Sequence, residues 1–369
     1  MTQFYGKTRI CYGRYALETL EEQHCTNAFL VTDPFMVKSG LADQVTSHLE
    51  RIGLPYRVFS DVEPDPSLET VKRGTEEFIR AGSDLLVALG GGSSIDTGKA
   101  IAFFARKAMP DRQKPVLVAI PTTSGTGSEV TAYSVVTDKE RGVKIPLIDD
   151  SILPDLAILD ARFTRTVPPS VTAATGMDVL THALEAYTCR YNNAFTDILA
   201  VQAIHYVFGY LFKSYQHMED MEAREMMLLG SCMAGMAFNN SGLGLTHSMA
   251  HALGGLFHVP HGLANAVLLP YVIRFNVFDA GVRYRELARV LGLPHANVEE
   301  GVSALISAVQ GLNDSMKIPS RVRDLKIDKA KYDAALDDMA RHAMDDRCTA
   351  GNPRRPSLQD LRELFETAW

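Results

Sequence analysis

The chain of 369 residues contains few cysteines and no motif that is built from them. The five cysteines are scattered, odd in number and never arranged as Cys-x-x-Cys. A disulfide framework or a zinc site made of thiolates needs paired or closely spaced cysteines. We therefore expect reduced thiols in a cytoplasmic protein, at Cys11, Cys25, Cys189, Cys232 and Cys348.

Excess positive charge and long apolar runs are lacking as well. The formal net charge is -7 and the sequence pI is about 5.9, so there is no basic surface for nucleic acid or an anionic membrane. No run of 18 or more apolar residues predicts a transmembrane helix, and the first residues lack the apolar core of a signal peptide. The proportions of 46% hydrophobic and 22% charged residues are those of an ordinary globular protein, and the length suits one large domain or two smaller ones.

Strand-like and helix-like segments alternate through the first 160 residues. Short apolar runs, typical of buried strands, cover residues 28–31, 56–59, 85–89, 116–120 and 155–160. The segments between them are expected to be helical at residues 41–52, 67–80 and 97–106. This alternation predicts a Rossmann-like α/β domain with a doubly wound parallel sheet.

The alternation stops after residue 160, and the rest of the chain has the pattern of an all-α domain. The first expected helices of that domain cover residues 171–188, 195–212 and 221–238. The hinge at 166–169 contains two prolines, so we expect two domains, 1–165 and 166–369. A segment rich in Asp, Arg and Pro at 345–356 is expected to be an exposed loop before the last helix.

Histidines are the most informative residues. Four of the eleven, at positions 247, 251, 258 and 261, fall within fifteen residues. His247 and His251 are four apart and therefore share one face of a helix. His261 follows two glycines and Pro260, and a turn there would bring it back toward the same point. By itself, such a group is also compatible with a pH-sensitive cluster or with buried core histidines.

Asp178 and His182 form a second pair four residues apart on an expected helix. By itself, this spacing is also typical of a surface or capping pair. Together with His247 and His261, however, the pair supplies one carboxylate and three imidazoles, a set suited to Fe(II) or Zn(II). His258 is the least secure of the histidines, and we expect it to line the site rather than to bind metal.

Two loops that follow expected strands are rich in glycine, serine and threonine. Gly90-Gly91-Gly92-Ser93 precedes a helix, where backbone amides and the helix dipole favour a pyrophosphate, although a simple tight turn is an alternative. The segment 121–129, PTTSGTGSE, offers hydroxyls and amides at the same edge of the sheet. The chain contains no G-x-x-x-x-G-K-[ST] motif, which argues against a P-loop nucleotidase.

Asp33 ends the first apolar run. A carboxylate there would accept hydrogen bonds from a ribose and repel a 2′-phosphate, which favours NAD over NADP. The alternative is that Asp33 only caps the helix that follows.

The motifs GGGSSIDTGKAI, PTTSGTGSEVT, GMDVLTHALEAY and HSMAHALGGLFHVPHGLANA resemble those of the iron-containing alcohol dehydrogenases over nearly the whole chain. The resemblance implies a dinucleotide-binding domain, a helical dehydroquinate synthase-like domain and an active site between them. It implies metal ligands at Asp178, His182, His247 and His261, with Fe(II) ahead of Zn(II), and a proton-relay role for His251. It implies NAD(H) contacts at Asp33, Gly91, Gly92, Ser93, Thr122, Thr123, Thr126 and Lys144.

The resemblance also implies a reaction. It is the interconversion of a short-chain aldehyde similar to propanal and its primary alcohol by hydride transfer. Phe238 and Leu243 fall where family members line the substrate pocket, whereas Tyr133 replaces a smaller polar residue found in some relatives. The alternatives are a lactaldehyde reductase, a polyol dehydrogenase or lyase on the same scaffold, a metallohydrolase, and a non-catalytic assembly partner.

The phrases CYG, EPDPS, AGMAF and HGLANAVLL are similar to those of family members from propanediol-using bacterial microcompartments. The resemblance thus implies a homodimer or larger homo-oligomer in the cytoplasm. It leaves open a location inside a microcompartment and contact with its shell proteins.

Overall fold

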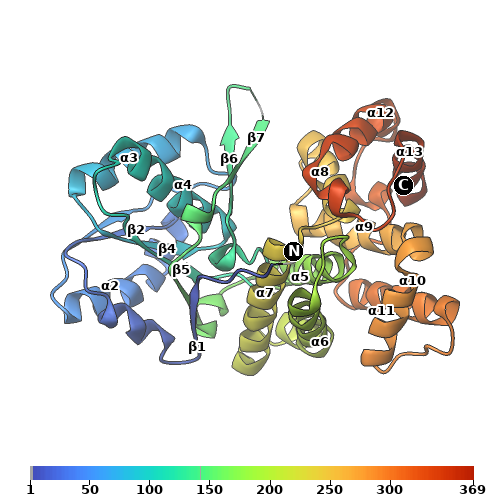
Figure 1. Cartoon of the computed structure of the whole chain (residues 1–369), viewed down its shortest axis with the longest axis horizontal. Helices are drawn as coiled ribbons and strands as arrows, with labels where there is room; N and C mark the ends of the chain where they lie inside the picture. The colour runs from blue at the N-terminus through green and yellow to red at the C-terminus, as the bar shows by residue number, and fades with distance from the viewer. Residues whose placement is uncertain (1–2, 142) are drawn as a thin grey trace. The chain divides into compact units, whose positions relative to one another are not determined.

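The computed structural model describes residues 3–141 and 143–369, which form two compact units (Figure 1). The first unit is Tyr5–Val167, and the second contains Pro168–Trp369. The division therefore falls two residues after the expected boundary at 165/166. Phe4 belongs to the second unit, because its ring stacks on Phe195 with the centroids 5.5 Å apart.

A six-stranded parallel sheet forms the centre of the first unit; the five apolar runs predicted five of its strands, whereas β1 (Arg9–Tyr12) was not predicted. Its strands lie in the order β1-β8-β5-β4-β2-β3. Their bounds are β1 Arg9–Tyr12, β2 Ala28–Val31, β3 Tyr56–Phe59, β4 Leu85–Gly90, β5 Val116–Pro121 and β8 Leu156–Leu159. The inner strands are buried on both faces, which explains why their residues are almost all apolar.

Helices cover both faces of this sheet. The short helix η1 (Ala16–Glu22) and α2 (Leu41–Arg51) pack on one face, and α3 (Leu68–Ala81) and α4 (Gly92–Ala108) on the other. A short helix α1 (Pro34–Lys38) follows β2. Helix α4 begins at Gly92, five residues before the expected start, so the glycine loop runs straight into its first turn.

The sequence did not lead us to expect the antiparallel hairpin of β6 (Tyr133–Asp138) and β7 (Val143–Ile148). The Val135 amide donates to Asp96 Oδ2 at the start of α4 over 2.9 Å, and the Thr137 amide donates to the Pro66 carbonyl over 2.7 Å. Short 3-10 turns complete the first unit, namely η2 Ser128–Val130, η3 Asp150–Ile152 and η4 Ala161–Thr164.

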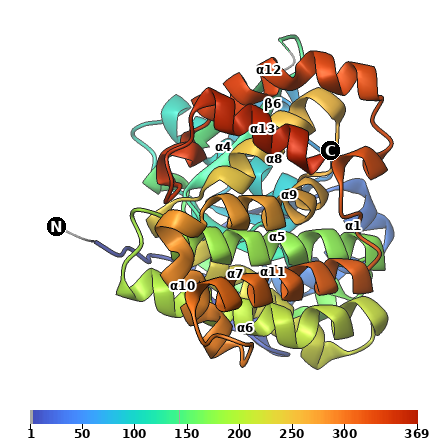
Figure 2. The same ribbon diagram turned by 90° about the vertical axis from the view of Figure 1, so that its right-hand side faces the viewer.

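The second unit is helical, as expected. Its long helices are α5 Pro169–Thr188, α6 Ala194–Gln216, α7 Met221–Ser241, α8 Leu245–Phe257, α9 His261–Phe275, α10 Val277–Val290, α11 Val298–Ser315, α12 Lys329–Asp345 and α13 Leu358–Ala368, with 3-10 turns η5 Val322–Leu325 and η6 Arg347–Gly351. Helix α5 packs against α6, α7 and α9 (Figure 2) and is buried almost throughout its last three turns. Small residues allow this packing: a Cβ on Gly176 would lie 2.1 Å from Leu211 Cδ1 of α6.

Among the described residues, α6 is long and apolar enough to cross a membrane by length and composition alone. The same helix packs against α5 and α7 through a buried face that includes Ala200, Ile204 and Leu211. Core helices of globular proteins meet the same criterion, so this observation does not identify a membrane span.

The segment 345–356 is not the exposed loop that its composition suggested. Thr349, Gly351 and Asn352 are buried. The Gly351 carbonyl accepts from the Arg190 amide over 2.9 Å, and Asn352 Oδ1 accepts from the Leu245 amide over 3.2 Å. The prediction was wrong because these polar groups satisfy backbone atoms at the ends of α5 and α8 rather than contacting water.

Candidate metal centre and cofactor loops

Three helices of the second unit bring the four candidate metal ligands together. Asp178 and His182 lie one turn apart on α5, and His247 lies in the first turn of α8. Helix α8 ends at Phe257 and is capped by His258, which has a left-handed φ of 55°, and His261 is the first residue of α9. The tight turn between α8 and α9 therefore returns His261 to the same point, as the spacing suggested. His258 itself is exposed and lies outside the group.

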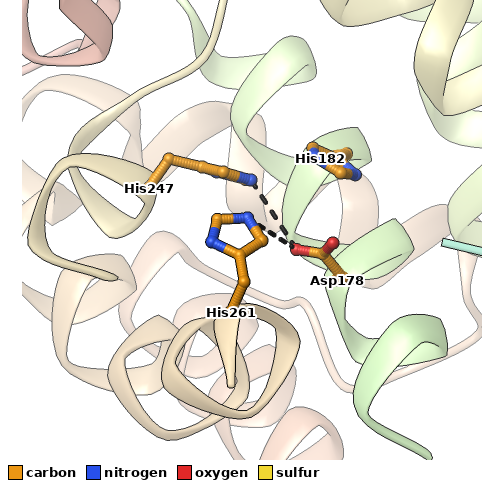
Figure 3. A group of neighbouring side chains, drawn as sticks. All are labelled: Asp178, His182, His247 and His261. Atoms are coloured by element: carbon orange, nitrogen blue, oxygen red, sulfur yellow. Dashed lines mark ion pairs between the residues drawn. The ribbon is translucent and has the colours of Figure 1, made fainter. Parts of the chain in front are cut away.

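The distances within this group are those that a bound ion requires. One ligand atom from each residue can be chosen so that all four lie within 4.8 Å of one another. Asp178 Oδ1 lies 3.7 Å from His247 Nε2 and 3.5 Å from His261 Nε2 (Figure 3). Two ligands on a tetrahedral ion with bonds of about 2.1 Å lie about 3.4 Å apart, so these separations fit one shared ion.

Two ring nitrogens test this interpretation. His182 Nδ1 and His247 Nε2 are buried, and neither has a hydrogen-bond partner among the described residues. A buried polar atom without a partner is costly. His247 Nε2 lies 3.7 Å from Asp178 Oδ1, so a cation bound between these atoms would remove the cost at that nitrogen. One carboxylate and three imidazoles are also ligands that Fe(II) and Zn(II) share. The residues present therefore fit a divalent metal.

Glu185 is a functional residue that we did not predict. Its buried carboxylate accepts from the Gly244 amide over 2.9 Å and the Thr246 amide over 2.5 Å, and it lies 2.6 Å from His247 Nδ1. Holding Nδ1 in this way directs His247 Nε2 toward Asp178. The pattern was visible, because Asp178, His182 and Glu185 at i, i+4 and i+7 share one helix face.

Asn265 supports the group from the opposite side. Its Nδ2 donates to Asp178 Oδ1 over 2.7 Å and lies 3.1 Å from His261 Nε2. Asn265 follows His261 by one turn of α9, so the helix sets both positions. It too was absent from our predictions, since a single asparagine in an apolar helix carries no distinctive spacing.

The electrostatic surroundings favour the forms that bind metal. Burial, followed by the neighbouring His182 and His261, lowers the pKa of His247 well below its usual value, so its ring is neutral. Burial alone would raise the pKa of Asp178, but the neighbouring histidines and the hydrogen bond from Asn265 lower it, and the net direction is down. A neutral imidazole beside a carboxylate is the state in which both can donate electron pairs.

His251, the predicted proton-relay residue, lies beside this group and not within it. Its ring stacks on His261 with centroids 5.2 Å apart, and its Nδ1 lies 2.8 Å from Asp346 Oδ2. Of the two residues predicted to line the substrate pocket, Phe238 stacks on His182 with ring centroids 4.6 Å apart, whereas the Leu243 backbone packs on Gly351.

In the first unit, the glycine and threonine loops meet at the carboxyl ends of the neighbouring strands β4 and β5. Gly90 has a φ of 147°, and a Cβ there would lie 2.4 Å from Ser94 Oγ, so only glycine fits. A Cβ on Gly92 would lie 2.8 Å from Thr126 Cγ2, and one on Gly91 would lie 3.4 Å from Thr123 Oγ1. The two loops therefore bring together four predicted cofactor residues, Gly91, Gly92, Thr123 and Thr126. Ser93 lies in the first turn of α4, and Thr122 directly follows β5.

Asp33 lies at the neighbouring strand end, where the strand order changes direction between β2 and β4. Its Oδ1 accepts from the Phe35 amide over 2.8 Å and the Met36 amide over 3.1 Å, so the capping role is observed. Its Oδ2 faces the glycine loop, 3.5 Å from a Cβ built on Gly90. Ligands bind at such topological switch points in open α/β sheets.

The contact described for the Lys144 side chain is with Asp65 and not with these loops. Lys144 is on β7, and its Nζ lies 2.5 Å from Asp65 Oδ1. Tyr133 begins β6, and its carbonyl accepts from Lys99 Nζ over 2.9 Å. The cofactor contact proposed for Lys144 stays a prediction.

A buried charged cluster lies beneath the threonine loop. Lys99 Nζ donates to Ser128 Oγ and the Thr131 carbonyl, each over 2.8 Å, and Ser128 Oγ donates to Asp96 over 2.7 Å. Burial lowers the pKa of Lys99 to about 8 and raises the pKa of Glu129 to about 7. These bonds tie the residues that follow Thr126 to helix α4.

Comparison with known proteins identifies the family. Residues 7–161 match the iron-containing alcohol dehydrogenase family, and residues 172–369 match the C-terminal part of the Fe-containing alcohol dehydrogenase family. The chain belongs to this family of oxidoreductases, which confirms the resemblance seen in its motifs.

Individual relatives agree with this assignment. The chain is 41% identical to a NADPH-dependent butanol dehydrogenase of Clostridium saccharobutylicum, over 100% of this chain and 98% of that protein. It is 40% identical to the 1-propanol dehydrogenase PduQ of Salmonella typhimurium, over 99% of both. The solved structure of a 1,3-propanediol oxidoreductase is similar with a TM-score of 0.94 and 34% identity, over 100% of both chains.

Proposed function

We propose that the chain is an NAD-dependent, metal-dependent dehydrogenase that interconverts a short-chain aldehyde similar to propanal and its primary alcohol. The observation that carries the proposal is the convergence of Asp178, His182, His247 and His261 with two buried ring nitrogens that lack partners. Membership of the family supplies the reaction class.

The four side chains would hold one divalent ion, with Fe(II) preferred and Zn(II) the alternative. When bound, such an ion supplies Lewis-acid polarisation of the substrate oxygen. Glu185 fixes the orientation of His247, and Asn265 fixes Asp178. Both supporting residues are buried, so the ligand set is held in place by the helices before any ion binds.

The Gly91–Ser93 loop and Thr122, Thr123 and Thr126 would hold the pyrophosphate and nicotinamide parts of NAD(H), with Lys144 as a further contact. When bound, NAD(H) supplies the hydride chemistry. Asp33 Oδ2 would accept from the ribose while Oδ1 caps α1, so the two roles considered for Asp33 are compatible. The resulting preference for NAD differs from the coenzyme in the name of the Clostridium relative.

His251 would carry the proton between substrate and solvent. Its half-exposed ring touches His261, and Asp346 holds its Nδ1, so Nε2 is the atom left for exchange. Phe238, stacked on His182, would form an apolar wall for a short alkyl chain, and Leu243 a further part of it. Butanol, propanol and propanediol in the names of similar proteins support a small aliphatic substrate, and lactaldehyde remains the alternative.

Two further parts of the proposal concern the oligomeric state of the protein and its location in the cell. A homodimer or larger homo-oligomer in the cytoplasm is supported by the resemblance to the family. Likeness to PduQ supports the further proposal that the enzyme works with propanal inside a microcompartment, in contact with shell proteins.

The test is to measure bound metal and NADH oxidation by propanal in wild-type protein and in His261→Ala. We expect loss of both in the variant, because His261 would supply one of the four ligands. His258→Asn is the matched control, since asparagine tolerates the left-handed backbone at that exposed position. Wild-type metal content and turnover in His261→Ala would overturn the ligand assignment.

The same assay separates the alternatives. If the reaction requires NAD but no NADH accumulates, the protein is a lyase on this scaffold. If the protein hydrolyses a substrate and does not bind NADH, it is a metallohydrolase. Comparing NADH with NADPH, in wild type and in Asp33→Gly, tests the ribose contact. A wild-type preference for NADPH would contradict the role proposed for Asp33.

A further inference from the structure

A second group of metal-binding side chains lies beside the first, in the same unit. His251, Asp346 and Cys348 each offer one ligand atom, and these atoms lie within 4.8 Å of one another. His251 comes from α8, whereas Asp346 and Cys348 begin the 3-10 turn η6. None of the three belongs to the set of Asp178 and three histidines.

The carboxylate of Asp346 connects this group. Its Oδ2 lies 2.8 Å from His251 Nδ1, and its Oδ1 accepts from the Cys348 amide over 2.8 Å. The carboxylate of Asp346 therefore contacts both the imidazole of His251 and the backbone amide of Cys348.

Neighbouring residues hold the turn in place. Thr349 Oγ1 donates to Ser248 Oγ over 2.7 Å and to the Ala343 carbonyl over 2.5 Å, which ties η6 to α8 and α12. Ser248 and His251 lie on the same helix, α8. The contact between Thr349 and Ser248 therefore fixes Asp346 and Cys348 relative to His251. A group fixed in this way binds a cation without a large ordering cost.

We propose that His251, Asp346 and Cys348 form a second, separate cation site that takes a borderline-soft divalent ion of the Zn²⁺ class. Nitrogen, oxygen and sulfur ligands together select Zn²⁺ or Cd²⁺ over Mg²⁺ and Ca²⁺, which prefer oxygen alone. The His251 side chain is 46% exposed, so the ion can enter from solvent and keep a water as its fourth ligand.

Proton movements on binding balance without any redox step. The Cys348 thiol proton leaves to solvent as the metal–sulfur bond forms. When Nδ1 of His251 carries a ring proton, that proton leaves Nδ1 through solvent, and Nδ1 then donates its electron pair to the ion. The Asp346 carboxylate and the Cys348 thiolate then offset the two charges of the ion, which allows a second ion to bind near the catalytic one.

Occupation of this site inhibits the dehydrogenase, because it captures His251. This consequence depends on the proposed function, whereas the binding itself does not. The enzyme would then lose turnover in excess Zn²⁺ or Cd²⁺ while it keeps its first metal ion.

The test is a Cd²⁺ titration of the metal-loaded protein, followed by the ultraviolet charge-transfer absorption of a thiolate–Cd²⁺ bond. The set of Asp178 and three histidines has no sulfur, so exchange there does not contribute to this band. We expect the band in wild-type protein to saturate with one added ion, to disappear in Cys348→Ser, and to persist in Cys25→Ser, a matched control in the other unit. Asp346→Asn should weaken it.

An unchanged band in Cys348→Ser, or no band in wild-type protein, would overturn the proposal. Circular dichroism of each variant checks that it is folded. Turnover with propanal and NADH, measured in the same titration, is expected to fall in wild type and to persist in Cys348→Ser. If the protein shows no dehydrogenase activity at all, the spectroscopic result still decides whether the second site exists.

Discussion

At the scale of single residues, Glu185 is the carboxylate that orients one side chain of the candidate metal centre. It joins two backbone amides at the start of α8 to the ring of His247. Burial raises the pKa of Glu185, although the hydrogen bonds from Thr246 and Gly244 oppose this. The residue therefore depends on its partners, and its removal leaves three donors without an acceptor.

Glu185→Ala should weaken metal binding about 10- to 100-fold, as loss of an outer carboxylate does in other metal sites. The reason is that His247 Nδ1 loses the contact that orients the ring. Competition with a coloured chelator measures the affinity. Glu363→Ala on α13, at an exposed position, is the control, and equal affinity in both variants would show that Glu185 does not orient the ligand.

The buried Glu129 makes stability depend on pH. Its pKa rises from 4.5 to about 7, mainly through burial. Between these values the folded protein holds a proton that the unfolded chain has released, so the free energy of unfolding falls as the pH rises across that window. The loss is about 1–3 kcal/mol, and it is complete above the folded-state pKa.

Glu129→Gln should remove this slope and be more stable than wild type near neutral pH, because the amide carries no charge to bury. Urea unfolding at several pH values from about 5 to about 8 measures the difference. Glu76→Gln, on the exposed face of α3, should keep the wild-type slope. A steep slope in Glu129→Gln would assign the dependence to another group.

The spacing of Asp178, His182, His247 and His261 favoured a shared site but left alternatives open, and the resemblance to the family implied the same four residues. The structure brings these four residues together. The supporting residues were harder to predict. Asn265 lies one turn after His261 on α9, but its contact with Asp178 arises because α9 packs on α5, and Asp346 reaches His251 from a distant turn. Their local sequence contains nothing that distinguishes them from other polar residues, so tertiary structure was needed to find them.

At the scale of helices and strands, the separation of α5 and α9 depends on Gly262. A Cβ there would lie 2.3 Å from the Ala174 carbonyl oxygen, a backbone atom that cannot move without shifting α5. Gly262 follows His261 directly, so the same contact sets the position of that ligand relative to Asp178.

Gly262→Ala should lower the free energy of unfolding by about 1–3 kcal/mol and reduce bound metal, because α9 is forced away from α5. Gly311→Ala is the control. Position 311 is within α11 and nothing lies within 4 Å of an added Cβ, so a gain of up to about 1 kcal/mol is expected there. Thermal unfolding with metal analysis compares the two, and full metal content in Gly262→Ala would contradict the argument.

Most secondary structure of the sheet domain was predictable, because its inner strands are short apolar runs bounded by glycine and polar residues. The β6–β7 hairpin was not predictable in this way. Residues 143–146 of β7 are all exposed. The hairpin sequence therefore lacks the alternation of apolar and polar residues that marks a half-buried strand. The start of α4 was also misplaced, since glycine at 91 and 92 usually marks a loop rather than a first helical turn.

At the scale of the whole molecule, the candidate binding residues for the metal ion and those for NAD(H) belong to different units. All four residues of the metal group lie in Pro168–Trp369, and the glycine and threonine loops lie in Tyr5–Val167. Each unit has its own buried core. Binding of either ligand should therefore stabilise one unit directly.

Removal of metal by a chelator should loosen the second unit selectively. An ion held at about 1,000 times its dissociation constant contributes about 4 kcal/mol to the unit that binds it. Hydrogen exchange followed by mass spectrometry should show faster exchange in peptides from α5, α8 and α9, and little change in β4 and β5. NADH should protect the first unit instead, and equal effects in both units would contradict this prediction.

The hydrogen bonds of Gly351 and Asn352 have a consequence for biosynthesis. The last candidate metal ligand, His261, leaves the ribosome about 90 residues before Gly351 and Asn352, which brace the ends of α5 and α8. A nascent chain therefore exposes all four candidate ligands before these bracing residues have been made. If the four residues bind metal as proposed, chains truncated before residue 351 should bind it weakly.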